Sequence, residues 1–161
     1  MSSMAYPDNA IWIAIFPSIA LIIYAITSVS IKQSILVGFL SGFAFYASQI
    51  PWMTVYLGPV PWLALSTLEA IIYTLGALAI NSFWHRTQVL RKPSHFLVAG
   101  GVASLWVARE WVACNFPYGG FPWSRLALSQ SNSPLDDWVY WGGISALSFV
   151  IVFVTVLVIT T

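Results

Sequence analysis

The stretch WVYWGGISALSFVIVFVTVLVIT, residues 138–160, decides the fold class, because it is long, apolar and free of charged side chains. A helix of about 20 mostly apolar residues can cross the ~30 Å hydrocarbon core of a membrane. Four further apolar runs precede it, and each is continuous, whereas a β-barrel strand alternates polar and apolar residues. The sequence therefore predicts an all-α, polytopic transmembrane helical bundle. Its five expected spans are residues 10–29, 34–50, 61–84, 95–113 and 138–160.

The composition of the whole chain also indicates a membrane protein. Of the 161 residues, 59% are hydrophobic and 7% are charged, whereas about 25% of the residues of a soluble domain are charged. This balance excludes an ordinary soluble enzyme domain and a disordered segment. The net charge of +1, without a run of Lys or Arg, excludes a nucleic acid as partner. We expect a single membrane domain over residues 1–161.

Basic residues between the expected spans predict the orientation in the membrane. Lys32 and the loop 85–94, which holds two arginines and a lysine, carry most of the positive charge. The opposite side carries one basic residue, Arg125, in the loop 114–137. Because cytoplasmic loops are enriched in Lys and Arg, we expect Lys32 and the loop 85–94 inside. The N-terminus and the loop 114–137 are expected outside.

Few side chains in or near the spans could carry chemistry. Glu69 lies mid-span, and it is either a proton or headgroup contact or a hydrogen-bonded packing residue. An interface anchor is the favoured interpretation for Arg109, and a hydrogen bond to the outer loop is favoured for Glu110. Cys114 is expected to be inert, because both histidines lie on the other side of the membrane and cannot activate its thiol. No metal-ligand spacing is present, so neither a metal nor a cofactor is expected.

The most informative segment of the outer loop is NFPYGGFPWSRLALSQSNSPL, residues 115–135. Its Gly119-Gly120 pair between two prolines predicts tight turns. Four aromatic side chains flank these turns, so we expect the loop either to tuck back against the bundle or to lie in the outer headgroup layer. This composition favours a re-entrant-like aromatic outer loop with Arg125 placed for a lipid phosphate. Simple capping of the bundle is the open alternative.

This loop resembles the membrane region of apolipoprotein N-acyltransferases of the actinobacterial type. The similarity includes Trp106 and Glu110, the block Gly-Gly-Phe-Pro-Trp at residues 119–123, and Gly142-Gly143 in the last expected span. Further matching elements are Arg125-Leu126-Ala127, Ser129-Gln130, Ser133-Pro134-Leu135, Ser148-Phe149 and the segment 52–65. The likeness covers nearly the whole chain.

The resemblance implies an enzyme of the bacterial plasma membrane that transfers an acyl chain from a phospholipid donor to a diacylglyceryl lipoprotein. In that family the acyl chain passes through a thioester on a nitrilase-like catalytic domain, which follows the membrane helices. We expect this chain to be a truncated or split form that lacks the family's first span and that domain, and to be inactive by itself. No catalytic residue is expected in it, and Cys114 does not occupy the position of the family's nucleophile.

The resemblance also suggests which side chains contact lipid or substrate, namely Glu110, Phe121, Trp123, Arg125 and Gln130. Glu69 is a further candidate, from its position within a span. Arg125 and Gln130 would contact a headgroup, Phe121 and Trp123 would fix the depth of the loop, and Glu110 would orient it. Two other functions stay open: a non-catalytic membrane scaffold or degenerate remnant, and a small transporter, for which Glu69 is the one indication.

Overall fold

The computed structural model describes residues 5–6, 11–90 and 93–161, and its regular elements in this part of the chain are helices, without strands. This confirms the prediction of an all-α bundle. The longer helices are α1 (Ile15–Thr27), α2 (Ile31–Gln49), α4 (Pro59–Gln88), α5 (His95–Asn115) and α6 (Trp138–Thr160). The shorter elements are η2 (Trp12–Ala14), α3 (Met53–Leu57), η3 (Pro122–Ser124) and η4 (Leu126–Gln130).

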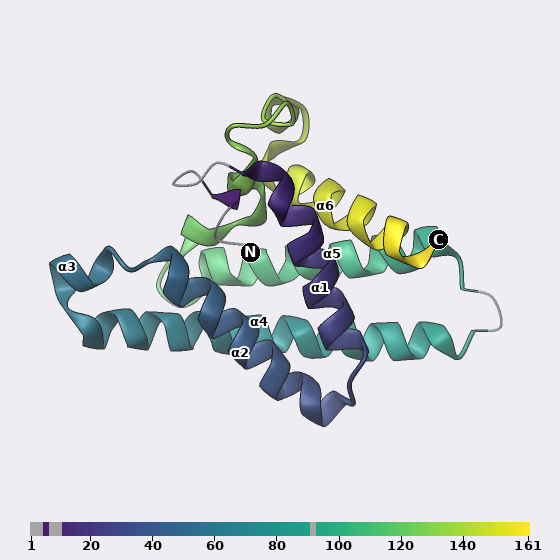
Figure 1. Cartoon of the computed structure of the whole chain (residues 1–161), viewed down its shortest axis with the longest axis horizontal. Helices are drawn as coiled ribbons and strands as arrows, with labels where there is room; N and C mark the ends of the chain where they lie inside the picture. Colours follow the sequence, from purple (N-terminus) through teal and green to yellow (C-terminus); the bar gives the residue numbers. More distant parts are fainter. Residues whose placement is uncertain (1–4, 7–10, 91–92) are drawn as a thin grey trace.

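The long helices pack around one apolar core. α4 and α5 run side by side in opposite directions, and α6 packs along α5 (Figure 1). α2 crosses α4 obliquely, while α1 packs against both α4 and α6 (Figure 1). Buried side chains at the centre include Ile19 and Ile23 of α1, Val102 of α5, and Ile151 and Val152 of α6. The outer loop leaves the end of α5 and returns to α6 beside this core.

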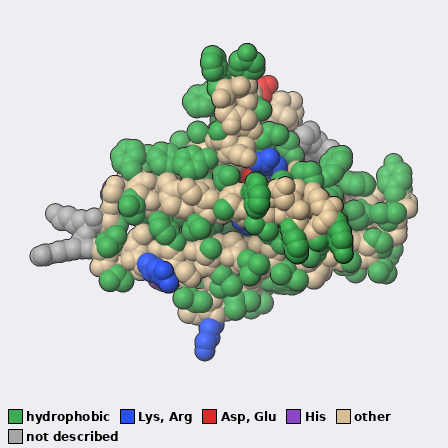
Figure 2. Space-filling model, turned by 180° about the vertical axis from the view of Figure 1, so that it is seen from behind, with side chains coloured by type: hydrophobic (Ala, Val, Ile, Leu, Met, Phe, Trp, Pro, Cys, Tyr) green, Lys and Arg blue, Asp and Glu red, His purple; other side chains and the backbone are tan. Residues whose placement is uncertain are grey.

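In the part of the chain that the structure describes, three helices are long and apolar enough to cross a membrane, namely α4, α5 and α6. The first expected span corresponds to a shorter apolar stretch, Trp12–Thr27, and α2 is not among the three. The number of five spans therefore stays a prediction. Figure 2 shows hydrophobic side chains over much of one face, with Lys and Arg at isolated points. Extended apolar surface of this kind is typical of a protein that contacts lipid or other proteins.

Small residues bring α2 and α4 into close contact. A Cβ atom added at Gly42 would lie 2.7 Å from the Cβ of Tyr73, and one added at Gly38 would lie 2.8 Å from the Cβ of Ala77. Both distances are shorter than real Cβ contacts, so glycine is required for this approach of the two helices. Small residues spaced four apart are a common helix interface in membranes, where close packing rather than the hydrophobic effect holds helices together.

Replacing Gly42 with valine is therefore expected to lower the free energy of unfolding by about 1–3 kcal/mol. The new side chain would meet Tyr73 and the backbone of Ala70 on α4, and the two helices would have to separate. Chemical unfolding in detergent micelles, followed by tryptophan fluorescence, measures the change. Gly100→Val is the matched control, because nothing lies within 4 Å of a Cβ added at Gly100. Equal stability of the two variants would contradict the close packing of α2 and α4.

The last expected span is interrupted near its start. Within α6, Gly143 has φ 71° and ψ 176°, a conformation that favours glycine and breaks the helical path. The unbroken part, residues 144–160, spans about 25 Å at 1.5 Å per residue. The turn before the break exposes Tyr140 and Trp141, each with 86% of its surface accessible. The apolar pattern predicted a span over residues 138–160 but gave no indication of this break.

Candidate functional site in the outer loop

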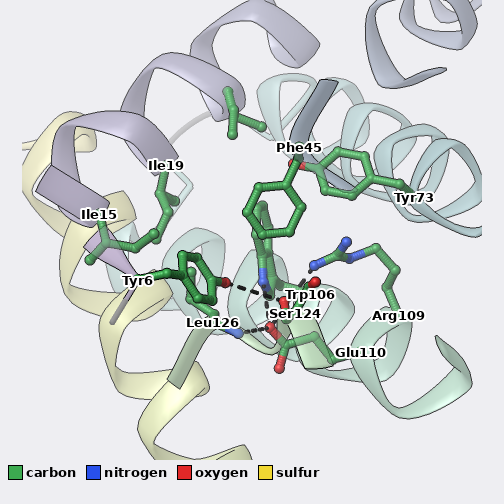
Figure 3. A pocket seen from close by; sticks show the side chains of 11 residues that line it. Tyr6, Ile15, Ile19, Phe45, Tyr73, Trp106, Arg109, Glu110, Ser124 and Leu126 are labelled. Carbon is green, nitrogen blue, oxygen red and sulfur yellow. Dashed lines mark hydrogen bonds and ion pairs between the residues drawn. The ribbon is translucent and has the colours of Figure 1, made fainter. Parts of the chain in front are cut away.

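Glu110 lies at the centre of a buried polar cluster that joins the outer loop to the bundle (Figure 3). It follows Trp106 by one turn of α5, and 4% of its surface is exposed. Its Oε1 atom accepts a hydrogen bond of 3.1 Å from Nε1 of Trp106 and one of 2.9 Å from the backbone N–H of Leu126. The hydrogen bond from the outer loop that the sequence suggested for Glu110 is therefore present.

Two further contacts hold the middle of the loop. The hydroxyl of Tyr6 lies 3.2 Å from both the Ser124 and the Arg125 carbonyl oxygens and donates to them. Burial, followed by the charge of Glu110, raises the pKa of Tyr6 well above its ordinary value, so the hydroxyl keeps its proton at neutral pH. From α6, the Ser148 hydroxyl accepts a bond of 3.2 Å from the backbone N–H of Ala127. The loop is thus attached to the N-terminal segment, α5 and α6.

The predicted tight turn is found at Gly119-Gly120. The N–H of Gly120 donates to the carbonyl of Pro117 at 2.9 Å, and the next N–H, of Phe121, donates to the carbonyl of Ala113 at 2.7 Å. Gly120 has φ 68°, and a side chain there would collide with the backbone at the end of α5. Glycine therefore allows the loop to fold back directly over the helix end.

Arg109 lies inside the bundle, and the expectation that it anchors at the membrane interface is wrong. Its side chain is 6% exposed, and its guanidinium carbon lies 4.3 Å from the ring centre of Tyr73 and 4.6 Å from that of Trp106. The nearest carboxylate oxygen, Glu110 Oε1, is 4.0 Å away. Two aromatic faces and one carboxylate thus offset part of the cost of burying the charge.

Arg125 occupies the outer edge of the same cluster. Its Nε lies 3.7 Å from Glu110 Oε2, and its side chain is 19% exposed. Its terminal nitrogen donates to the Ser145 hydroxyl on α6. The cluster therefore contains two guanidinium groups and one carboxylate, and one of the two guanidinium groups reaches the surface. An exposed guanidinium with spare donors can accept a phosphate or carboxylate ligand.

Three aromatic side chains of the loop are exposed. Their exposure bears on the two positions that the sequence left open for the loop, against the bundle or in the headgroup layer. Phe116 and Trp123 are each 63% exposed, and Tyr118 is fully exposed. The loop backbone is attached to the bundle at residues 124–127, while these three side chains stay exposed. A position of the loop in the headgroup layer stays a prediction. Trp123 forms a surface cluster with Trp52 and Phe121, with ring centres 5.8 Å and 6.5 Å away.

The remaining candidates, Gln130 and Glu69, are both fully buried. The Gln130 amide donates to Ser129 Oγ at 3.0 Å and to the Trp12 carbonyl at 3.4 Å, so in this structure a lipid headgroup does not reach it. Glu69 of α4 has Tyr46 and Arg109 as polar neighbours, and neither carboxylate oxygen has a hydrogen-bond partner among the described residues. The structure brings Glu69 near the Arg109 side of the cluster but not to the loop.

The pocket shown in Figure 3 joins the polar cluster to the apolar core. Glu110, Arg109 and Tyr6 line its polar end, and Ile15 and Ile19 of α1 line its apolar end. Its volume of about 10 Å³ is too small for an acyl chain. A lipid would therefore contact the outer surface of the loop instead. Within the described ranges, no three His, Cys, Asp or Glu side chains gather as a metal site.

Sequence reasoning missed Tyr6 and Ser145, which bind the loop directly, and Tyr73, whose ring contacts the Arg109 guanidinium. Tyr6 precedes the first expected span, and nothing in its neighbourhood pairs it with a loop more than a hundred residues away. The serines of α6 did carry a signal, because Ser145 and Ser148 are three residues apart on an otherwise apolar helix and so share one face. A polar stripe of this kind indicates a polar partner packed against the helix.

Comparison with known proteins gives one family for this chain. A family model described as "Apolipoprotein N-acyltransferase N-terminal domain" matches residues 1–157. The chain is 26% identical to the apolipoprotein N-acyltransferase of Vibrio vulnificus, an alignment that covers 94% of this chain and 30% of the relative. It is 30% identical to that of Pseudomonas putida, over 86% of this chain and 28% of the relative. The chain therefore spans about 30% of the length of these curated relatives.

Proposed function

We propose a function for this chain from one premise: it belongs to the family of the apolipoprotein N-acyltransferase N-terminal domain. Its helices are apolar and fit a multi-pass protein of a bacterial plasma membrane. We infer that the chain forms the membrane platform of a lipoprotein N-acyltransferase. Its outer loop receives the phospholipid acyl donor, and the acceptor is the N-terminal diacylglyceryl-cysteine of a lipoprotein.

The attachment of the outer loop to α5 through Glu110 carries this proposal. The buried carboxylate accepts the N–H of Leu126 at 2.9 Å, and it lies 3.7 Å from Nε of the neighbouring Arg125. A loop that is fixed by a buried carboxylate keeps one depth and one orientation. A surface that presents a lipid to a reacting group needs this rigidity, because small misplacements of the substrate lower the rate steeply.

Arg125 and Trp123 are the proposed lipid contacts of the loop. The guanidinium of Arg125 is partly exposed beside Ser145, where it can bind phosphate oxygens of a headgroup. Trp123 is 63% exposed next to Trp52, and tryptophan rings favour the headgroup depth of a membrane. Phe121 packs near Trp123 and supports its position.

The chemical step itself requires a partner domain in this proposal. Acyl transfer needs an activated nucleophile and donors that stabilise the developing oxyanion. Cys114 lies near the end of α5, whereas His95 begins that helix, about 28 Å away along its axis. The thiol therefore has no histidine base within reach. We propose that a nitrilase-like catalytic domain supplies the nucleophile and that this chain is inactive by itself.

Trp123→Ala is expected to slow formation of the acyl-enzyme about tenfold, which corresponds to the loss of one aromatic contact worth about 1.4 kcal/mol. The chain is reconstituted in phospholipid vesicles together with a nitrilase-like domain taken from a full-length member of the family. Intact-mass measurement of that domain over time then reports the acyl thioester. Thermal unfolding of the variant should be unchanged, because Trp123 lies on the surface.

Trp141→Ala is the matched control, since Trp141 is also an exposed tryptophan but belongs to α6. Its rate should equal that of the unmodified chain. An unchanged rate for Trp123→Ala would remove the loop from the mechanism. If the domain forms the thioester equally well without the chain, the platform role falls and a non-catalytic scaffold or remnant becomes the better interpretation.

A further inference from the structure

An apolar groove runs along the outside of the bundle between α2 and α4. Ile35 and Phe39 of α2 form one wall, and Ile71, Leu75 and Leu78 of α4 form the other. The groove has a volume of about 510 Å³ and opens to the outside of the bundle. Its side chains are far from covered, because Ile35 and Ile71 are each 49% exposed and Leu75 is 61% exposed.

The close packing of α2 and α4 produces this groove. Gly38 brings the α2 backbone against Ala77 and Thr74, so the larger side chains on either side of the contact stand out as two walls. Thr74, at the floor, donates its hydroxyl proton to the Ala70 carbonyl at 2.7 Å. The floor therefore presents no free hydroxyl donor, and the groove fits an apolar chain.

One end of the groove carries a positive charge. Lys32 lines that end and is exposed. Among the residues that the structure describes, the ion pairs involve Arg109 and Arg125 but not Lys32. Lys32 also lies in the first turn of α2, where the helix dipole adds positive potential. An apolar channel that ends in an unpaired ammonium group is complementary to a molecule with an anionic head and an apolar tail.

We propose that this groove binds one acyl chain of an anionic phospholipid, whose phosphate contacts Lys32. Phe39 follows Lys32 by seven positions, which is about 10 Å along the helix axis. With the ammonium at headgroup depth, the groove therefore covers the upper part of the acyl chain. Lys32 has a flexible stem that can follow the phosphate.

The site is independent of the function proposed for the outer loop. Lys32 is at the first turn of α2, and the far end of α2 leads to Trp52, which contacts Trp123 of the loop. The groove therefore lies toward the end of α2 opposite the loop. The two proposals can fail separately, because one is measured by lipid retention and the other by acyl transfer.

Native mass spectrometry of the 161-residue chain, released from mixed phosphatidylglycerol and phosphatidylcholine nanodiscs, tests the proposal. Lys32→Gln should lower the preference for phosphatidylglycerol about fivefold, the usual effect of one basic residue near a membrane surface. Leu75→Trp fills the groove and should remove the retained lipid of both kinds. The matched controls are Arg86→Gln, an exposed basic residue, and Leu40→Trp, an exposed leucine of α2 outside the groove.

The controls distinguish lipid binding in this groove from an effect of general surface charge and from a second copy of the chain that covers the groove. If Arg86→Gln lowers the preference as much as Lys32→Gln, the effect is general surface charge and the proposal is overturned. If Leu75→Trp retains lipid like Leu40→Trp, the groove is not the acyl site. If Leu75→Trp instead dissolves a dimer of the chain, the groove is covered by a second copy and the lipid proposal is again overturned.

Discussion

Glu110→Ala is expected to lower the free energy of unfolding by about 3–5 kcal/mol, because it removes one partner from a buried charge cluster. The N–H groups of Leu126 and Trp106 would lose their shared acceptor, Oε1 of the carboxylate. Arg109 and Arg125 would then lie close together without an intervening negative charge. Chemical unfolding in detergent micelles measures the loss. Hydrogen exchange at residues 121–130 should also rise, since the loop would detach from α5.

Glu110→Gln separates the two roles of this side chain, which are to accept hydrogen bonds and to carry the negative charge between the two arginines. The amide oxygen can still accept from Leu126 and Trp106, so the loop should stay protected from exchange while part of the stability is lost with the charge. Asp137→Ala is the control, because it removes an exposed carboxylate from the same loop and should change stability by less than about 0.5 kcal/mol. Loop protection that is equal in Glu110→Ala and the unmodified chain would show that Glu110 does not hold the loop.

The helical fold and the main loop contact could be predicted from the sequence for a clear physical reason. A membrane leaves a chain no way to satisfy its backbone other than helices or a closed barrel, so continuous apolar runs determine the fold class. Glu110 could be assigned to the loop through the family resemblance, in which the glutamate one turn after Trp106 orients the loop by accepting its hydrogen bonds. The first argument needs hydropathy alone, and the second needs the resemblance.

The remaining features depend on contacts between distant segments. Arg109 stands at the same helix end as Glu110, and from the sequence it could extend to the interface or turn inward. Tyr73, on another helix, and Trp106 decide between these positions, because their rings receive the guanidinium. Tyr6 could not be assigned to the loop for the same reason. The break at Gly143 depends on a single residue, whose effect on a long apolar run is invisible to hydropathy.

Replacement of Arg109 is expected to have the second large effect on the free energy of unfolding. It tests which contacts stabilise this buried charge. Arg109→Met keeps much of the side-chain volume but leaves Glu110 with Arg125 as its one remaining charged neighbour. We expect a loss of about 3–5 kcal/mol in the free energy of unfolding, as for other broken buried pairs. Exposed Arg86→Met is the control, and its effect should stay within about 0.5 kcal/mol.

Arg109→Lys then distinguishes charge from shape. A role in charge balance alone would make lysine an adequate substitute, because the ammonium group retains the positive charge near Glu110. The geometry favours a different result: the guanidinium carbon lies 4.3 Å and 4.6 Å from two ring centres, while the carboxylate oxygen is at 4.0 Å without a hydrogen bond. A planar, weakly hydrated guanidinium stacks on such rings, whereas a compact and strongly hydrated ammonium does not. Arg109→Lys should therefore lose more than half as much free energy of unfolding as Arg109→Met. If Arg109→Lys is instead as stable as the unmodified chain, the rings of Tyr73 and Trp106 contribute only packing.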